Sequence, residues 1–476
     1  MNRTRLLRRA VSAVAVAGLA LSAAACSSSG SSGSSGEESK AGSGSSTKAA
    51  GDASSAKLDP NAKVTISIDC QPPTTKTAER KEWAEDIAAF KTMYPNVTIN
   101  SKDTSPCEEP ARFTAQLQGK TQPDVFYTYF TDLNQVLDAG GAEDISQYVN
   151  DETVPALKDI DPSVLDTLKS DGKLYGLPKS NYKMGLLYNR KLFKQAGLDP
   201  DQPPTTWDEI RADAKKIAAL GGGVYGYGEY SATNQGGWHY TAELYGLGGK
   251  MVNDDATKAT FNTPEGKQVL QNLYDMRWTD KSMAAAQGLK WPDLMTQMAA
   301  NKLGMYVGAP DDITYMVQTL KGNYEDYGMG PMPGEQGALL GGDDYMFKKG
   351  STPDQIKAGI AWINFKYLTM GKGQFDYART KADGLPVGLP EPFFFGGATL
   401  DADNKAKAAS ATVPVANYAP YLAKSVPGVT EPANAQQIYK VLDNPVSAVL
   451  TDKNANIDKL LSEAENQVNQ VLASLQ

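Results

Sequence analysis

The amino-acid sequence predicts an α/β protein whose folded part is large enough for two domains of ordinary size. From Leu58 to Gln476 there are roughly 420 residues, and a domain commonly holds about 100–200 residues. Hydrophobic residues make up 41% of the chain and charged residues 21%, which is typical of a soluble globular protein. Strand and helix patterns alternate at the start of this part, which is the order found in α/β proteins.

The alternation rests on two kinds of hydrophobic spacing. β-branched residues alternate with polar ones in the strand patterns, whereas Trp83, Ile87 and Phe90 recur at the spacing of one helix face. Because strand–helix–strand units join parallel strands, the sequence predicts a parallel sheet here. The strand patterns are residues 64–68, 97–99 and 123–127, and the helix patterns are residues 78–94, 113–117 and 133–138.

The first residues have the pattern of an export signal. Four arginines up to Arg9 give a basic start, residues 10–25 form an apolar run without charge, and small residues lead to Cys26. A basic start, a short apolar run and a small-residue cleavage site define a signal peptide. The run is shorter than the roughly 20 residues of a membrane-spanning helix. Residues 1–25 are therefore predicted to be a signal peptide.

Cys26 stands where a bacterial lipoprotein carries its lipid. The segment resembles a lipoprotein box, except that Ala23 occupies the position where leucine is usual. The resemblance implies cleavage before Cys26 and lipidation of that cysteine. An ordinary secretory signal with an incidental cysteine is the alternative. The Arg8–Arg9 pair leaves a twin-arginine export route open.

Residues 26–57 are predicted to be the lipidated cysteine and a flexible tether. Serine, glycine, alanine and lysine dominate this segment, which cannot bury enough apolar surface to offset its ordering entropy. A coil of about 30 residues has an r.m.s. reach of roughly 30 Å. A lipid and such a tether would hold the folded part at the extracellular face of the cell membrane without fixing its orientation.

Net charge excludes one class of partner. The chain carries −8 at pH 7, and removal of a leader with four arginines would bring the charge to about −12. Phosphate binding requires a basic face. We therefore expect no nucleic acid partner.

Apart from Cys26, the chain contains two cysteines, Cys70 and Cys107. Two cysteines in an exported protein predict a disulfide. With His239 as the single histidine, there are too few ligands for a Cys/His zinc site. Oxygen-ligand sites for calcium or magnesium stay open, although no EF-hand spacing is found. We expect no metal and no cofactor.

The most specific pattern lies between residues 171 and 216. It comprises Asp-Gly-Lys-Leu-Tyr-Gly-Leu-Pro at 171–178, Leu-Tyr-Asn-Arg at 187–190 and Pro-Pro-Thr-Thr-Trp-Asp-Glu at 203–209. This run resembles the signature of the extracellular solute-binding proteins of carbohydrate ABC importers, family 1, the maltose-binding-protein relatives. Residues 304–310, 327–333, 341–347 and 358–368 fit the same family. The resemblance therefore covers about residues 64–475.

The resemblance implies a two-lobed periplasmic-binding-protein-like fold of type II, each lobe a mostly parallel sheet flanked by helices. Lobe 1 is expected to comprise residues 58–178 with 345–388, and lobe 2 residues 184–340 with 396–476. Crossing segments near residues 178–184, 341–345 and 388–396 would form the hinge. Within this pattern, Thr206 is predicted to cap a helix, with Glu209 at the capping-box position.

Ligands of such sheets bind beyond the carboxyl ends of the strands. Asp69 and Gln71 follow the first strand and could contact a sugar hydroxyl, with loop solvation as the alternative. Tyr129 and Asp132 follow the third strand, in a loop where the resemblance implies ligand contacts. Asp132 could equally be the N-cap of the next helix.

In lobe 2, the resemblance implies that Trp238 and Tyr240 stack on the sugar, with a core role as the alternative. Asp311 occupies a position where the family often has tryptophan, so a stacking platform is replaced by a carboxylate. Asp343 and Asp344 follow two glycines at the second crossing, where close backbone approach needs glycine. We expect one of these two aspartates to contact the ligand.

The sequence favours a binding protein over an enzyme. A Ser–His–Asp constellation would need His239, but no Gly-x-Ser-x-Gly elbow accompanies it, and a neutral hydrogen-bonded or surface role fits that histidine better. We predict a monomer that captures a sugar or oligosaccharide and delivers it to the permease subunits of an ABC importer. The alternatives are a cell-surface carbohydrate-active enzyme, such as a lyase or hydrolase, and the same fold binding a non-sugar, cationic solute.

Overall fold

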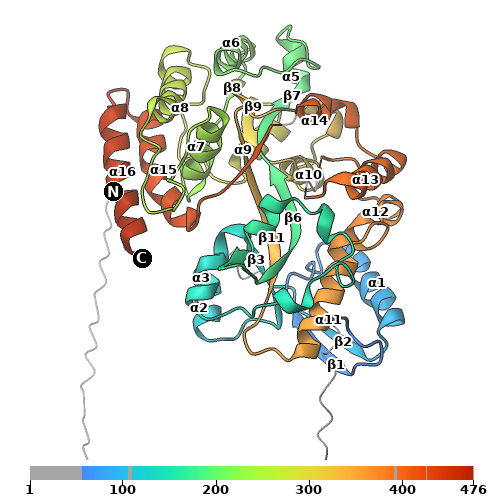
Figure 1. The fold of residues 1–476 in the computed structure, drawn as a ribbon. Coiled ribbons are helices and arrows are strands. Elements are labelled where there is room, and N and C mark those ends of the chain that lie inside the picture. The colour runs from blue at the N-terminus through green and yellow to red at the C-terminus, as the bar shows by residue number, and fades with distance from the viewer. Residues whose placement is uncertain (1–55, 105–109, 391–393, 425, 475–476) are drawn as a thin grey trace, which may run out of the picture. The chain divides into compact units, whose positions relative to one another are not determined.

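The computed structural model describes residues 56–104, 110–390, 394–424 and 426–474. Within these residues, strands form two larger sheets and one two-stranded ribbon, and helices pack against the sheets (Figure 1). The predicted α/β class is confirmed. The predicted signal peptide, Cys26, nearly all of the tether and Cys107 lie outside the described residues.

The first sheet has the strand order β12-β11-β3-β1-β2, and β6 pairs with the other edge of β11. β1 runs parallel to β2 and β3, as the sequence predicted, whereas β11 runs antiparallel to β3 and β6. The strands are β1 (Val64–Ile68), β2 (Val97–Ser101), β3 (Val125–Tyr129), β6 (Gly176–Lys183), β11 (Ala338–Phe347) and β12 (Gly428–Thr430).

The second sheet has the order β10-β7-β9-β8. Its pairing differs from the mostly parallel sheet that was expected, because β7 runs antiparallel to both β9 and β10. Of the described pairs within this sheet, only β8 and β9 are parallel. The reason is connectivity: β7 follows β6 directly and β10 leads back to β11. The strands are β7 (Gly185–Asn189), β8 (Tyr225–Tyr227), β9 (Leu303–Gly308) and β10 (Tyr327–Gly330), and the ribbon pairs β4 (Lys169–Ser170) with β5 (Lys173–Leu174).

Helices separate most of these strands along the chain. Those of the first half are α1 (Thr77–Met93), α2 (Pro110–Gln118), α3 (Leu133–Asp138), α4 (Pro162–Asp166), α5 (Arg190–Gln195), α6 (Trp207–Ala218) and α7 (Gln235–Gly246). Those of the second half are α8 (Pro264–Tyr274), α9 (Asp293–Ala299), α10 (Asp311–Gln318), α11 (Pro353–Ile363), α12 (Tyr377–Ala382), α13 (Gly397–Ser410), α14 (Ala419–Ala423), α15 (Ala435–Thr451) and α16 (Ile457–Ser474). Across the described residues, no helix has the length and apolar character needed to cross a bilayer.

The start of α6 has the capping interactions that the sequence predicted. The Thr206 hydroxyl accepts a hydrogen bond from Glu209 N at 3.3 Å, and Glu209 Oε2 accepts one from Thr206 N at 3.1 Å. This reciprocal pair is the predicted capping box, and it satisfies two backbone donors at the start of α6.

Strand β11 belongs to both halves of the folded part. One of its edges pairs with β6 from Leu340 to Met346. Its other edge pairs first with β12, at residues 338–340, and then with β3, at residues 343–347. Gly341 and Gly342 lie in the gap between these two partners. We call the part around β1–β3 lobe 1 and the part around β7–β10 lobe 2.

Each lobe has its own hydrophobic core. In lobe 1, Trp362 of α11 is fully buried and meets the rings of Trp83 and Phe90 from α1 at centroid distances of 5.7 and 5.4 Å. In lobe 2, α7 crosses α15 so closely that a Cβ on Gly237 would stand 2.3 Å from the Tyr439 carbonyl oxygen. Glycine at this position is therefore required by helix packing.

The pairing of Cys70 with Cys107 stays a prediction, because Cys107 is outside the described residues. Cys70 directly follows the loop end of β1, and its backbone N–H donates to the Thr104 carbonyl at 2.9 Å. This bond brings the chain just before Cys107 alongside Cys70, which supports the pairing.

We predict that replacing Cys70 and Cys107 by serine lowers the free energy of unfolding by roughly 4 kcal/mol, because the disulfide closes a loop of about 36 residues in the unfolded chain. Urea unfolding with and without reductant measures this difference. Reductant should bring the wild type down to the double variant and leave the variant unchanged. A wild type that is equally stable in both buffers would show that the bond does not form.

Candidate ligand-binding cleft

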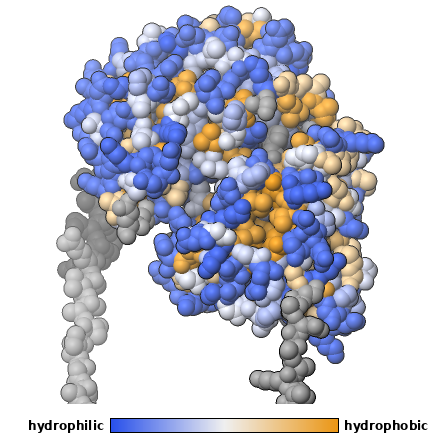
Figure 2. Space-filling view, viewed as in Figure 1, coloured by the Kyte–Doolittle hydropathy of each residue, from blue (hydrophilic) through white to orange (hydrophobic). Residues whose placement is uncertain are grey.

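The middle of β11 lies between the carboxyl end of β3 and β6, at the junction of the lobes. Asp343 pairs in register with Tyr129 of β3 on one side and with Ser180 of β6 on the other. These three residues therefore form one row across three strands. In the space-filling view, hydrophobic residues gather near the middle of the visible face, at the height of β6 and β11 (Figures 1 and 2).

Asp343 is the anchor of a polar cluster in this row. Its Oδ2 lies 2.5 Å from Lys179 Nζ and accepts a hydrogen bond from Ser180 Oγ at 2.8 Å. Lys179 also lies over the Tyr127 ring, 5.1 Å from its centroid. Burial alone would lower the pKa of Lys179, but the Asp343 carboxylate outweighs it and holds that pKa above its ordinary value. The lysine therefore stays charged.

Asp344, the neighbour of Asp343, is in a different environment. Successive strand residues point to opposite faces, and the Asp344 side chain is fully buried, with a hydrogen bond from Thr128 Oγ1. Burial raises the pKa of Asp344 well above its ordinary value. Of the two candidate aspartates, the structure thus favours Asp343 as the one within reach of a ligand.

The side chains of Asp69 and Asp132, both predicted ligand contacts, accept hydrogen bonds from backbone N–H groups. Asp69 is 1% exposed and accepts from Tyr127 N at 2.8 Å, and burial raises its pKa to about 7. Asp132 accepts from Tyr129 N at 3.0 Å, and burial raises its pKa to about 6. Asp132 stands at the N-cap position of α3 but makes no side-chain capping bond there. Gln71 is half-buried, and its backbone N–H bonds to Lys102 O.

Tyr182, near the end of β6, stands at the centre of the junction. Its ring lies against the backbone of Gly341, where a Cβ would come within 2.4 Å of the Tyr182 hydroxyl. The ring also meets Trp238 of α7 edge-on, at a centroid distance of 6.4 Å. The crowding of protein around Tyr182 raises its pKa well above the ordinary value, and nearby acidic groups raise it further. These groups are Glu431, Asp311, Asp343 and Tyr129.

The two lobe 2 acids of this group approach from different segments. Glu431 follows β12 and accepts a hydrogen bond from the Tyr439 hydroxyl at 2.8 Å, and burial raises its pKa to about 7. Asp311 begins α10, at the carboxyl end of β9. Asp311 is exposed to solvent, and desolvation by the surrounding protein together with the Asp343 carboxylate raises its pKa to about 6. Charged groups of both lobes are thus close enough to act on the ionisation of Tyr182.

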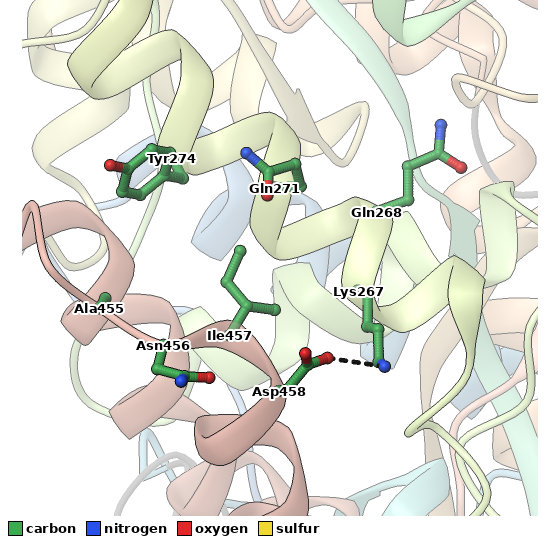
Figure 3. Close-up of a pocket in the computed structure, with 8 residues that line it drawn as sticks. All are labelled: Lys267, Gln268, Gln271, Tyr274, Ala455, Asn456, Ile457 and Asp458. Carbon is green, nitrogen blue, oxygen red and sulfur yellow. Dashed lines mark ion pairs between the residues drawn. The ribbon is translucent and has the colours of Figure 1, made fainter.

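A second hollow lies elsewhere in lobe 2 and has a different character. It measures about 520 Å³ and is formed by one side of α8 and the chain that leads into α16 (Figure 3). Lys267 and Asp458 form an ion pair of 2.7 Å at its edge. It contains no strand end, so the chemistry of the cleft does not extend to it.

The sequence and structure comparisons agree with this geometry. Residues 74–369, more than half of the chain, match the family of bacterial extracellular solute-binding proteins. The chain belongs to this family. A solute-binding protein of this kind delivers its ligand to an ABC importer.

Three similar proteins illustrate the family. A binding protein of Brucella abortus is 28% identical over 398 residues, which cover 79% of this chain and 88% of the relative. The sn-glycerol-3-phosphate-binding periplasmic protein UgpB of Brucella melitensis is 29% identical over 234 residues, covering 46% and 51%. The structure of an ABC transporter solute-binding protein from Thermotoga lettingae, bound with α-D-tagatose, matches with a TM-score of 0.67 at 22% identity, covering 86% and 99%. This match confirms the predicted two-lobed fold.

In this solute-binding protein, the two aromatic residues predicted on α7 have different surroundings. Trp238 is half-buried and faces Tyr182. Tyr240 is 1% exposed and packs in the lobe 2 core, its ring 6.0 Å from that of Phe261. The packing alternative therefore fits Tyr240, whereas ligand contact by Trp238 stays a prediction.

Sequence reasoning did not single out Lys179, Tyr182 or Glu431. Lys179 and Tyr182 lie within the first crossing segment, directly after Pro178, so a search of that segment for polar and aromatic residues would have found them. Glu431 follows a short strand that pairs with β11, and no local pattern marks it.

Behind Trp238, α7 carries a buried polar cluster. His239 Nδ1 lies 2.6 Å from Glu229 Oε1, and the Tyr227 hydroxyl donates to Glu243 at 2.9 Å. Burial raises the pKa of Glu229 to about 8 and lowers that of His239 to about 4. His239 is therefore neutral at pH 7 and hydrogen-bonded.

We predict that the free energy of unfolding of Glu229→Gln falls less than that of the wild type between pH 6.5 and 8.5. The raised pKa means that folded Glu229 keeps a proton that the unfolded chain has released. The contribution of protonated Glu229 to the free energy of unfolding is therefore lost as the pH rises towards 8. Urea unfolding at several pH values should show the wild type losing of the order of 1 kcal/mol more than Glu229→Gln across this range.

The matched control for this measurement is Glu463→Gln, on the exposed side of α16, which should follow the wild type. Identical pH profiles of the wild type and Glu229→Gln would mean that Glu229 does not hold the extra proton.

Proposed function

We propose that this protein is a lipid-anchored extracellular solute-binding protein that captures a sugar or oligosaccharide for import by an ABC transporter. The observation that carries the proposal is the composition of the cleft. The Trp238 and Tyr182 rings lie beside a row of polar groups from Asp343, Ser180 and Lys179.

This combination suits the two kinds of surface on a sugar. The C–H faces of a sugar ring pack on flat aromatic side chains, and its hydroxyl groups need donors and acceptors at fixed positions. Lys179 donates, Asp343 accepts, and Ser180 does both. A sugar that lacks one hydroxyl would leave one of these groups unpaired, which is a source of specificity.

Closure of the lobes is the second part of the proposal. We keep the expected lobes, residues 58–178 with 345–388 and residues 184–340 with 396–476, as the bodies that move. Along the chain, β6 leads directly into β7 and β10 leads back to β11, so these strands connect the two sheets. Small changes in β6 and β11 would therefore rotate one core against the other. A ligand that contacts both lobes favours the closed form by population shift.

The choice of a sugar without phosphate over a phosphorylated ligand rests on Lys179. A phosphate group requires an unneutralised cation or several backbone donors. Lys179, the cation at the centre of the cleft, already forms an ion pair with Asp343, and the surrounding groups are acidic. This supports a ligand other than sn-glycerol-3-phosphate, the compound in the name of the UgpB relative.

We predict that Trp238→Ala weakens sugar binding at least about tenfold, equivalent to about 1.4 kcal/mol, because the ligand loses an aromatic face. Isothermal titration calorimetry with the best ligand from a thermal-shift panel of sugars measures the affinity. Ligand binding to the folded form alone raises the unfolding midpoint.

Leu220→Ala, a change at an exposed residue beyond α6, serves as the control and should bind like the wild type. Small-angle scattering of the wild type should show a smaller radius of gyration with ligand. Unchanged affinity of Trp238→Ala would place the sugar elsewhere, and a panel in which no sugar binds would refute the proposed function.

We predict that Cys26→Ser moves the protein from the membrane fraction to the medium when it is produced in a bacterium that processes lipoproteins, because one acyl-bearing residue provides the anchor. Cell fractionation and detergent-phase partitioning measure the distribution. Ser27→Ala, next to the lipidation site, should stay with the membrane. A wild type found mainly in the medium would favour the ordinary secretory signal.

A further inference from the structure

An aromatic pair of one exposed and one half-buried ring lies beside the proposed cleft on lobe 2. Trp291 is 45% exposed, one of the few large hydrophobic side chains with that much solvent contact in the described part of the chain. Its ring lies on that of Tyr315, with centroids 4.6 Å apart. An exposed aromatic face of this kind is open to contact with a ligand.

Asp311 shares a helix face with this aromatic pair. Asp311 and Tyr315 both belong to α10 and are four residues apart, so their side chains lie on the same side of the helix, one turn apart. The next residue, Asp312, is buried and accepts hydrogen bonds from the Tyr306 hydroxyl, at 2.9 Å, and from the Trp291 side chain. In the described part of the chain, no ion pair of 4.0 Å or less joins Asp311 to a basic side chain.

The aromatic pair and Asp311 adjoin the cleft rather than the outer surface. The Trp291 backbone N–H donates to Gln235 in the first turn of α7, the helix that carries Trp238. Asp311 is close enough to Asp343 and Lys179, on the strands that join the lobes, for their charges to act on its ionisation. We call Asp311, Trp291 and Tyr315 the rim subsite.

We propose that the rim subsite binds a positively charged nitrogen of the ligand, so that the protein prefers an amino-substituted sugar, or another ammonium-bearing solute, over its neutral counterpart. This inference rests on the proposed function and adds the charge of the ligand to it. An ammonium group gains from the electron-rich face of a tryptophan and from an unpaired carboxylate. The rim subsite offers both side by side.

Lobe closure explains why the ligand should carry a positive charge. Closing would remove more water from Asp311 and bring it towards the Asp343 carboxylate, and burying an unpaired carboxylate is unfavourable. A hydroxyl group supplies a hydrogen bond but no compensating charge. Lys179 cannot supply it either, since its ammonium group is held by Asp343 at 2.5 Å. A cationic ligand resolves this repulsion and so couples its own binding to closure.

The test uses the full chain and two matched probe pairs in isothermal titration calorimetry: glucosamine with glucose, and choline with its uncharged carbon analogue. In the wild type, the charged member of at least one pair should bind at least about tenfold tighter than the neutral member. Asp311→Asn should reduce this preference to less than about twofold. Trp291→Ala should weaken binding of the charged probe by about tenfold.

Asp254→Asn is the matched control, because Asp254 is exposed and pairs only with the exposed Lys250 among the described residues. It should keep the full preference, and thermal unfolding of each free variant verifies its fold. Lowering the pH from 7.5 to 5 should weaken binding of the charged probe about tenfold in the wild type, as Asp311 becomes protonated. Asp311→Asn should lack this pH dependence.

The outcomes separate this inference from the proposed function. Equal binding of charged and neutral members, no binding of any charged probe, or a preference that persists in Asp311→Asn would overturn the inference. Tight binding of glucose without preference would overturn it and leave the proposed sugar capture standing. Binding of choline alone, dependent on Asp311, would support the inference and refute sugar capture.

Discussion

The pairing of β11 with three different partners is the constraint on which the rest of the structure depends. β6 holds one edge of β11 along most of its length, while β12 and β3 share the other edge end to end. The gap between them falls at Gly341 and Gly342, where side chains would collide with Tyr182, Phe130 and the Ser180 carbonyl. The two glycines therefore allow an aromatic ring to lie directly on the strand that joins the lobes.

Acidic groups dominate the electrostatics around this junction. Burial raises the pKa of Asp69, Asp132 and Glu431 into the range of about 6 to 7, whereas Lys179 stays charged because of Asp343. Such raised values are common at functional sites, because a cleft removes water from groups that must meet a ligand. The charge state of the empty cleft is thus adjustable near neutral pH, and a ligand that carries charge would alter it.

Much of the fold was predictable because its signals are local. Hydrophobic spacing placed β1 and α1 within a residue or two of their observed ends, and Thr206 with Glu209 predicted the capping box that the structure contains. The site was predictable only in outline. Trp238 and Tyr240 are two residues apart on one helix, yet one meets Tyr182 at the junction of the lobes and the other packs in the core. Asp343 and Asp344 differ in the same way, because adjacent strand residues face opposite sides.

By itself, the sequence determined the class of the fold and its family, because these follow from hydrophobic periodicity, turn residues and motifs over short stretches. Only the tertiary structure decided which side chains meet. Lys179 with Asp343, Tyr182 with Trp238, and Trp291 with Tyr315 come from segments far apart in the chain or from opposite strands. Their contacts depend on strand register and helix packing, and a shift of one residue in β11 would turn Asp343 away from the cleft.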